Sequence, residues 1–282
     1  VLLVDEQTQL GGTLLFAPVA IGGRTGLDWV SELEAELRSF PEVTILNRST
    51  VTGYYDHNFL VVNERRTDHI GPGQASSKTT RERLWRIRAK QVVIATGAIE
   101  RPLVFDGNDA PGVMLASAVS TYIRRFAVAP GRSGVVFTNN DSGYQAALDM
   151  VSAGMEVRAV VDIRENPGAS VLAAVSACEI PVYRECVVSS VQSGFQGLKR
   201  IELAKLSPGG EDILSHKGLI NCQVLAISGG WSPAVHLHSQ SGGRPRYDSA
   251  KACFVPGSSV QAECSVGACG GSFTLAACLR EG

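Results

Sequence analysis

Two acidic residues and a pair of glycines follow a short apolar run, VLLV, at the start of the sequence; they are Asp5, Glu6, Gly11, Gly12 and, just after them, Thr13. In a nucleotide-binding βαβ unit, an acid at the end of a buried strand accepts hydrogen bonds from ribose hydroxyls. The glycine pair lets the backbone approach a ligand closely, and a threonine hydroxyl can donate to a ribose or a pyrophosphate. These residues predict an adenine-dinucleotide site, although a strand ending in solvated acids would have the same sequence.

A second apolar run, QVVI, ends in the small residues ATGA, which include Thr96 and Gly97. This pattern is typical of the second fingerprint of flavoproteins with two dinucleotide domains, in which the chain leaves the first domain close to the bound cofactor. A buried strand followed by a glycine turn is the alternative interpretation.

A third small-residue segment, SVGACGGSFT, precedes an apolar stretch near the last residue, and a helix is expected from Gly267 to Leu279. Small residues at the start of a helix leave backbone N–H groups and the positive end of the helix dipole free to face an anion. The segment is therefore expected to cover the cofactor; its candidate residues are Gly267, Ala268, Gly271, Phe273 and Thr274.

Between the strand SGVVFT and the next helix, the turn TNNDSG stands where a G-x-G-x-x-G motif would be. Of its glycines, Gly143 alone is present, and Thr138 and Asn140 place side chains where a pyrophosphate would approach. A second nucleotide site is not expected here, although Asp162, at the end of the following strand, is placed where it could bind a ribose.

Other chemistries find little support in the sequence. His236 and His238 are two residues apart and have no acidic or cysteine partner at metal-ligand spacing, so no metal site is predicted. The motifs G-x-S-x-G, H-E-x-x-H and G-x-x-x-x-G-K-[ST] do not occur, which disfavours hydrolases and P-loop enzymes. The seven cysteines form no C-x-x-C pair and are expected to be mostly buried thiols.

The overall composition excludes further classes of partner. The formal net charge of −1 indicates no nucleic-acid or lipid partner, and no apolar stretch reaches the roughly 18 residues of a membrane span. No secretory signal is evident, and the expected location is the cytoplasm.

The elements that must hold these residues follow from the apolar periodicity. A helix is expected from Asp28, as its cap, to Pro41, and a β-meander from Val43 to Ile94, interrupted by a polar loop between Arg65 and Arg83. From Ser133 onward a βαβαβ series predicts a parallel sheet, with helices over 142–153 and 167–178.

The expected fold class is α/β, with two Rossmann-like, three-layer FAD/NAD(P)-binding domains, a β-meander insertion, and a first domain split by the second. The expected ranges are 1–105 for the first dinucleotide-binding domain, 106–220 for the second, and 221–282 for the return to the first. Because the sequence opens inside a sheet, the glycine-rich strand and turn of the first domain are expected upstream of Val1.

Several strings resemble the α subunit of heterotetrameric sarcosine oxidase, and the likeness extends over nearly all 282 residues. The most specific are NDAPGVM and SGGWSPAVHL; the others are VLLVDEQTQLGGTLL, STVTGYYDHNF, VVFTNNDSGYQAALDM and SVGACGGSFTLAACLREG. The resemblance implies a fragment of a larger polypeptide whose complex oxidises sarcosine to glycine with O2 and tetrahydrofolate. It also implies FAD and FMN in the whole complex, and β, γ and δ subunits as partners.

In that family the α subunit holds NAD, with FAD as the alternative at the same site, and amine oxidation belongs to the β subunit, so no catalytic residue is expected here. The resemblance adds Gln7 beside the two acids and Val51 as backbone offered to the adenine. Cys269 departs from the small-residue pattern of the motif. Alternatives that stay open are a stand-alone NAD(P)H:flavin reductase, a scaffold that only docks partner proteins, a related opine or amino-acid oxidase, and part of a hydrogen cyanide synthase.

Overall fold

The computed structural model of the chain describes residues 1–71, 74, 79–195 and 197–281 and divides into two compact units. Unit 1 comprises residues 1–99 and 232–282, and unit 2 comprises residues 100–231. The second unit thus interrupts the first, and the predicted α/β class with a split first domain is confirmed. The predicted boundaries, after residues 105 and 220, lie 6 residues later and 11 residues earlier than those of the two units, and the assignment of the ranges as dinucleotide-binding domains stays a prediction.

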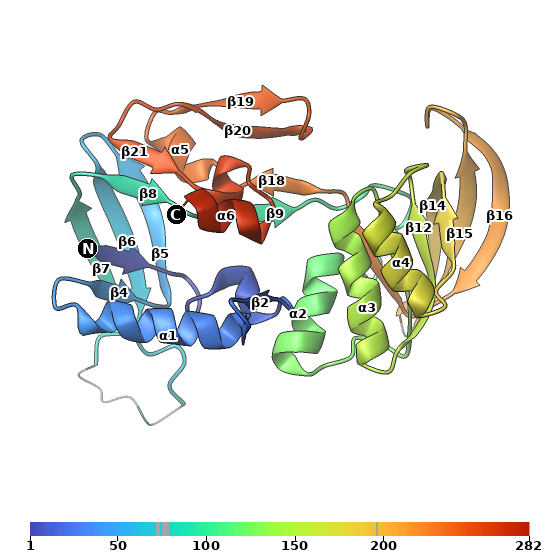
Figure 1. Ribbon diagram of the computed structural model, residues 1–282, viewed down its shortest axis with the longest axis horizontal. Coiled ribbons are helices and arrows are strands. Elements are labelled where there is room, and N and C mark those ends of the chain that lie inside the picture. Colours follow the sequence, from blue (N-terminus) through green and yellow to red (C-terminus); the bar gives the residue numbers. More distant parts are fainter. Residues whose placement is uncertain (72–73, 75–78, 196, 282) are drawn as a thin grey trace. The chain divides into compact units, whose positions relative to one another are not determined.

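Unit 2, drawn in green through orange in Figure 1, is built on a five-stranded parallel sheet in the order β10-β17-β11-β12-β13. The strands are β10 (Val113–Leu115), β11 (Ser133–Thr138), β12 (Glu156–Asp162), β13 (Val182–Arg184) and β17 (Val224–Ser228). The helices are α2 (Ala116–Phe126), α3 (Tyr144–Ser152) and α4 (Ala169–Ala177), with the 3₁₀ turn η2 (Asp141–Gly143).

The two faces of this sheet are covered differently, which gives three layers. Val136 and Val160 pack against the helices, whereas Val135 and Val161 pack against an antiparallel sheet. That sheet is β14 (Cys186–Gly194), β15 (Gly197–Leu206) and β16 (Ile213–Asn221). Since side chains alternate along a strand, the continuous apolar runs of β11 and β12 serve both layers.

Unit 1 contains two short parallel pairs of strands and an antiparallel meander. The pairs are β1 (Leu2–Val4) with β4 (Thr44–Leu46), and β8 (Val92–Ile94) with β21 (Glu263–Ser265). The meander is β5 (Ser49–Tyr55), β6 (Phe59–Arg65) and β7 (Glu82–Arg88). Smaller strands are β2 (Ala20–Ile21), β3 (Arg24–Thr25), β19 (Arg244–Asp248) and β20 (Cys253–Ser258), and the chain passes between the units in β9 (Ala98–Glu100) and β18 (Trp231–Pro233).

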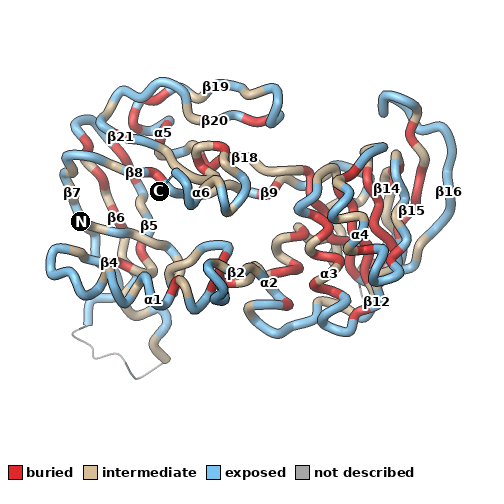
Figure 2. Tube along the Cα trace, in the orientation of Figure 1, coloured by how far each residue is buried: buried red, intermediate tan, exposed pale blue. Residues whose placement is uncertain are grey.

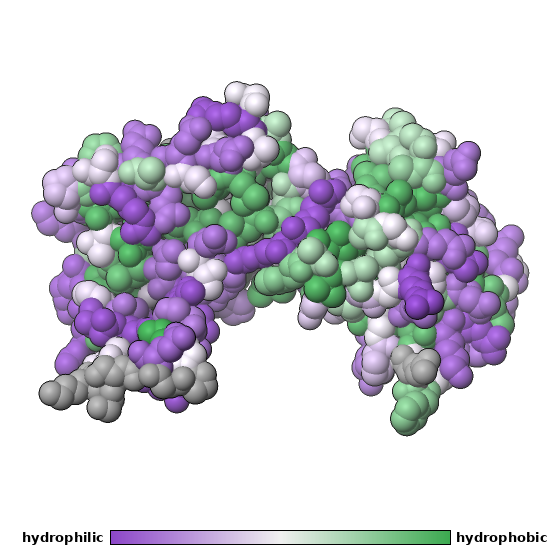
Figure 3. Space-filling view, turned by 90° about the horizontal axis from the view of Figure 1, so that it is seen from below, coloured by the Kyte–Doolittle hydropathy of each residue, from purple (hydrophilic) through white to green (hydrophobic). Residues whose placement is uncertain are grey.

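The helices of unit 1 are α1 (Gly26–Ser39), α5 (His236–Gln240) and α6 (Leu275–Glu281), with 3₁₀ turns η1 (Gly12–Leu15) and η3 (Gly267–Gly270). Its core joins Tyr54 and Leu60 of the meander to Ile94 and Cys269. Figure 2 shows buried residues in both units; they form continuous runs in β11, β12 and β17 of unit 2, whereas in the strands of unit 1 they are interrupted by less buried residues. On the face seen in Figure 3, hydrophilic and hydrophobic residues are interspersed.

Some predictions about the elements were wrong. The cap of α1 is Thr25, not Asp28: the Thr25 hydroxyl accepts the Asp28 amide at 3.1 Å and donates to the Asp28 carboxylate at 2.7 Å. The helix expected from Gly267 begins at Leu275, because Gly267 and Gly271 have φ angles of 63° and 91°, outside the helical region. The strand β8 leaves the meander and pairs in parallel with β21.

The first part of the expected meander, residues 43–55, forms two strands, β4 and β5, separated at Arg48, whose φ is 53°, and β4 pairs with β1 instead of joining the meander. Most of the loop expected between β6 and β7, namely residues 72–73 and 75–78, lies outside the described residues.

Candidate dinucleotide site

The predicted binding residues lie in unit 1, mostly where strands end. Figure 1 shows β1, β8 and β21 running in the same direction across unit 1, so their carboxyl ends lie on the same side of it. Asp5 follows β1, Thr96 follows β8, and Gly267 follows β21. The carboxyl ends of parallel strands are where open α/β sheets bind ligands.

The Asp5 backbone is fixed by the neighbouring strands, since its amide donates to the Leu46 carbonyl and its carbonyl accepts from the Ser49 amide, both at 2.9 Å. One carboxylate oxygen, Oδ1, accepts from the Gln7 amide at 2.7 Å. Asp5 is half-buried, and among the described residues no cationic side chain forms an ion pair with it. The Glu6 side chain is exposed, and its carbonyl accepts from Arg65.

The glycines after β1 and β8 have conformations that other residues rarely adopt. Gly11, Gly12 and Gly97 have φ angles of 127°, 52° and 75°. A Cβ added at Gly12 or Gly97 would meet nothing within 4 Å, so open space adjoins their backbone. Thr13, which follows this pair in η1, is exposed. These positions allow a ligand to approach main-chain atoms closely.

Thr96 and Val51 have structural contacts that the sequence did not reveal. The Thr96 hydroxyl donates to the Ala234 carbonyl at 2.9 Å and lies 3.3 Å from the Cys269 sulfur. Val51 pairs with Val62 in the meander and packs against the core. Cys269 itself is fully buried, which accounts for a cysteine in the small-residue segment.

The Gly267 segment is arranged differently from the expected helix start. The Gly267 amide donates to the Glu281 carboxylate at 2.7 Å, and the Ser272 hydroxyl donates to the same carboxylate. Together, the Ser272 hydroxyl and the Gly267 amide hold the pKa of Glu281 below its usual value. The amide predicted to face an anion is thus bound to a side chain of α6, while Phe273 and Thr274 are exposed and Ala268 is half-buried.

The structure adds Lys251 to the candidates. A Cβ built at Gly271 would lie 2.9 Å from the Lys251 amine, which places a cation against the small-residue turn. Lys251 stands in the β19–β20 connection, about 20 residues before the glycine, and no motif connects the two in the sequence. Its position could be found only from the fold.

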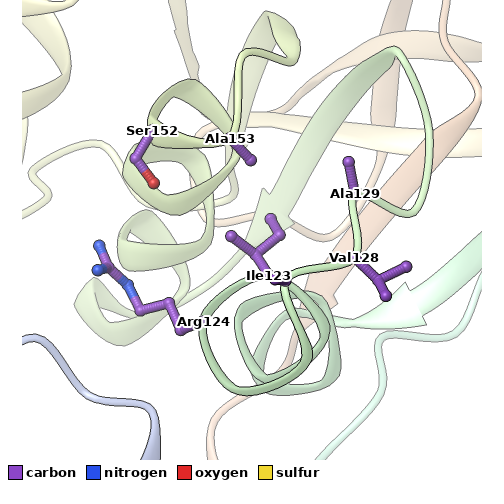
Figure 4. A pocket seen from close by; sticks show the side chains of 7 residues that line it. Ile123, Arg124, Val128, Ala129, Ser152 and Ala153 are labelled. Carbon is purple, nitrogen blue, oxygen red and sulfur yellow. The ribbon is translucent and has the colours of Figure 1, made fainter.

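A pocket in unit 2 involves none of the predicted residues. Figure 4 shows it at the carboxyl ends of α2 and α3, lined by Ile123, Arg124, Ala127, Val128, Ala129, Ser152 and Ala153. Arg124 is held by an ion pair with the buried Asp149 at 2.6 Å. In the part of the chain that the structure describes, no group of three or more His, Cys, Asp or Glu side chains has the geometry of a metal site.

The chain was compared with protein families and with known proteins. No family model matches the chain. Over 282 residues it is 39% identical to the α subunit of sarcosine oxidase from Rhizobium meliloti; the aligned region is all of this chain and 27% of that protein. It is 40% identical to the corresponding protein of Corynebacterium sp. strain P-1 and covers 29% of it. The chain therefore spans a little over a quarter of these relatives, and the resemblance found in the sequence is confirmed.

Solved structures confirm the fold class. The thioredoxin reductase of T. acidophilum superposes with a TM-score of 0.70 at 17% identity, covering 99% of this chain and 85% of that one. The L-proline dehydrogenase of P. horikoshii superposes with a TM-score of 0.66 at 19% identity, covering 95% of this chain and 46% of that one. No helix among the described residues is long and apolar enough to cross a membrane.

Proposed function

We propose that this chain, similar over its whole length to about a quarter of the sarcosine oxidase α subunit, is the part of an oxidoreductase that carries an adenine dinucleotide. The site is in unit 1. The observation that carries the proposal is the Asp5 carboxylate, half-buried at the end of a parallel strand and bonded through Oδ1 to its own turn. Such a carboxylate is available to the vicinal hydroxyls of a ribose.

The residues around Asp5 fit the rest of the ligand. Gly11 and Gly12 follow the acid and Gly97 follows β8, where open space adjoins Gly12 and Gly97. We assign Glu6, Gln7 and Thr13, which follow Asp5 in the chain, as further polar groups for the ligand, and Lys251 with the segment Gly267–Thr274 as the groups for its phosphate oxygens. Val51 supports the wall of the site by packing against the core of unit 1, and Thr96 does so by donating a hydrogen bond to the Ala234 carbonyl.

NAD is the proposed ligand and FAD the alternative, because both present the same adenosine to Asp5. When bound, such a group accepts or donates hydride, or serves a structural role. The contribution of this chain is to bind and orient it; no described side chain of unit 1 is proposed as an acid or base catalyst.

The whole enzyme is proposed to oxidise sarcosine to glycine with O2 and tetrahydrofolate, in the cytoplasm. It would contain FMN and FAD and would assemble with β, γ and δ subunits. An opine or other amine is the alternative substrate, since a 77-residue stretch of the chain is 32% identical to one of the subunits of the opine oxidase of Rhizobium meliloti. Turnover of the intact complex with sarcosine and with opines distinguishes the two.

The test of the dinucleotide site uses the complete subunit in its complex. We expect mass spectrometry of the denatured complex to find about one equivalent of NAD or FAD, and Asp5→Asn to lower its retention at least ~10-fold by removing a charged hydrogen bond. Glu36→Gln, an exposed acid of α1, is the matched control and should retain the ligand. Full retention in Asp5→Asn, or no dinucleotide in the wild type, would contradict the proposal.

A further inference from the structure

The turn of unit 2 between β11 and α3 has the position of a phosphate-binding loop, yet its own side chains satisfy its backbone groups. The Thr138 hydroxyl accepts the Asn140 amide at 3.1 Å and donates to the Asn140 carbonyl at 2.9 Å. The Asn140 side-chain oxygen accepts the Ser142 amide at 3.1 Å, and its nitrogen donates to the Ser228 hydroxyl at 3.0 Å. Two amides that would face a pyrophosphate therefore already have partners.

The turn is also closed sterically. A Cβ at Gly143 would lie 2.5 Å from the Thr138 hydroxyl oxygen, which shows how tightly this threonine packs against the start of the helix. The Trp231 indole N–H donates to the Ser142 hydroxyl at 2.9 Å and ties a second segment to the turn.

The acid of this unit is likewise occupied. Asp162 ends β12, as Asp5 follows β1, but it is fully buried. Its Oδ1 accepts from the Arg164 amide at 2.9 Å and from Arg164 Nε at 3.1 Å. Its Oδ2 accepts from Arg164 Nη2 and from the Tyr144 hydroxyl, both at 2.8 Å. These four bonds use the acceptor positions of the carboxylate.

An outer ion pair holds the arginine in place. Arg164 Nη1 lies 2.8 Å from Asp141, whose Oδ1 also accepts the Gly168 amide at 3.2 Å. Arg164 thus bridges the two strand–helix connections on which a dinucleotide would lie. Asp5 of unit 1, at the corresponding strand end, has no such cation among the described residues.

From this geometry we infer that unit 2 is a nucleotide-binding fold closed by its own side chains. Arg164 and Tyr144 satisfy Asp162 in place of ribose hydroxyls, and Asn140 satisfies the turn in place of a phosphate. Unit 2 therefore takes no pyridine nucleotide, and a nicotinamide-dependent flavin reductase working through this unit is excluded. Unit 2 is closed in this way whichever ligand unit 1 binds.

The first test is hydrogen exchange of the full-length protein with and without NADH or NADPH at about 1 mM, where weak nucleotide binding would be populated. We expect peptides covering 134–146 and 158–166 to exchange at unchanged rates. Saturable protection of these peptides would overturn the inference. Peptides covering 1–16 report on nucleotide binding to unit 1. The proposed site of unit 1 and the closed turn of unit 2 are therefore tested separately in the same experiment.

The second test is Asp162→Asn, which weakens the internal pairing. We expect a lower unfolding midpoint with no change in the amount or affinity of bound nucleotide, whereas Asp212→Asn, an exposed acid of the same unit, should change neither. If Asp162→Asn does not fold, Tyr144→Phe removes one bond more gently and should give the same pattern. Loss of nucleotide affinity with an unchanged unfolding midpoint in either variant would overturn the inference.

Discussion

At the scale of single residues, most of the buried polar side chains that the structure describes have hydrogen-bond partners within the protein. His238, which the sequence offered only as a weak metal candidate, is fully buried, and its Nδ1 lies 2.7 Å from Glu263 Oε1. The same oxygen accepts the Ser259 hydroxyl at 2.6 Å, and the Gly257 amide donates to His238 Nε2 at 3.4 Å. The two ring nitrogens therefore face different partners: Nδ1 faces the buried Glu263 carboxylate and Nε2 faces the Gly257 amide.

Removing this histidine should be costly. We expect His238→Ala to lower the free energy of unfolding by about 3–5 kcal/mol, because it leaves the buried Glu263 carboxylate without its main donor. His236→Ala, two residues away and outside the buried core, is the control and should change stability by less than about 0.5 kcal/mol. Urea unfolding measures both; equal midpoints would show that the pair contributes little.

The cysteines should react according to burial. Burial raises the pKa of the Cys222 thiol to about 12, so at pH 8 it stays protonated and unreactive in the folded protein. Cys178 and Cys264 are exposed. We expect iodoacetamide to modify these two first and Cys222 at least ~100-fold more slowly, read by peptide mass spectrometry. Labelling of Cys222 at the rate of Cys264 would contradict the burial of its side chain.

At the scale of elements, the cap of α1 gives a direct test. We expect Thr25→Ala to destabilise unit 1 by about 0.5–2 kcal/mol, because the Asp28 amide loses its acceptor. Ser31→Ala, on the exposed surface of the same helix, should be close to neutral. Thermal unfolding of the two variants measures the difference. Indistinguishable midpoints would show that the Thr25 cap does not stabilise α1 measurably.

The elements that were predictable are those with a strong local signal. The βαβαβ series of unit 2 follows from apolar runs punctuated by turn residues, and the acid after β1 follows from its place at the end of such a run. The pairing of β8 with β21, the contact between Lys251 and Gly271, and the capture of the Gly267 amide by Glu281 depend on distant parts of the chain. The helix at Gly267 was predicted wrongly because small residues that suit a helix start also suit a turn with positive φ.

At the scale of the whole molecule, the contiguous range 100–231 contains two complete hydrophobic clusters on the two faces of its sheet. We therefore expect this range, expressed alone, to fold and to unfold cooperatively. Circular dichroism and urea unfolding measure this. A fragment with exposed apolar surface and no cooperative transition would show that residues of unit 1 are needed for its core.

The pairing of β8 with β21 also bears on the order of events during synthesis. Val92 and its partner Glu263 are about 170 residues apart, and all of unit 2 is translated between them. On the ribosome, unit 2 can complete its sheet while β8 still lacks its neighbour, and domains generally fold as units during elongation. Translation pauses or truncations before residue 263 should leave the first 99 residues sensitive to proteases and dependent on chaperones, while the inserted unit is already resistant.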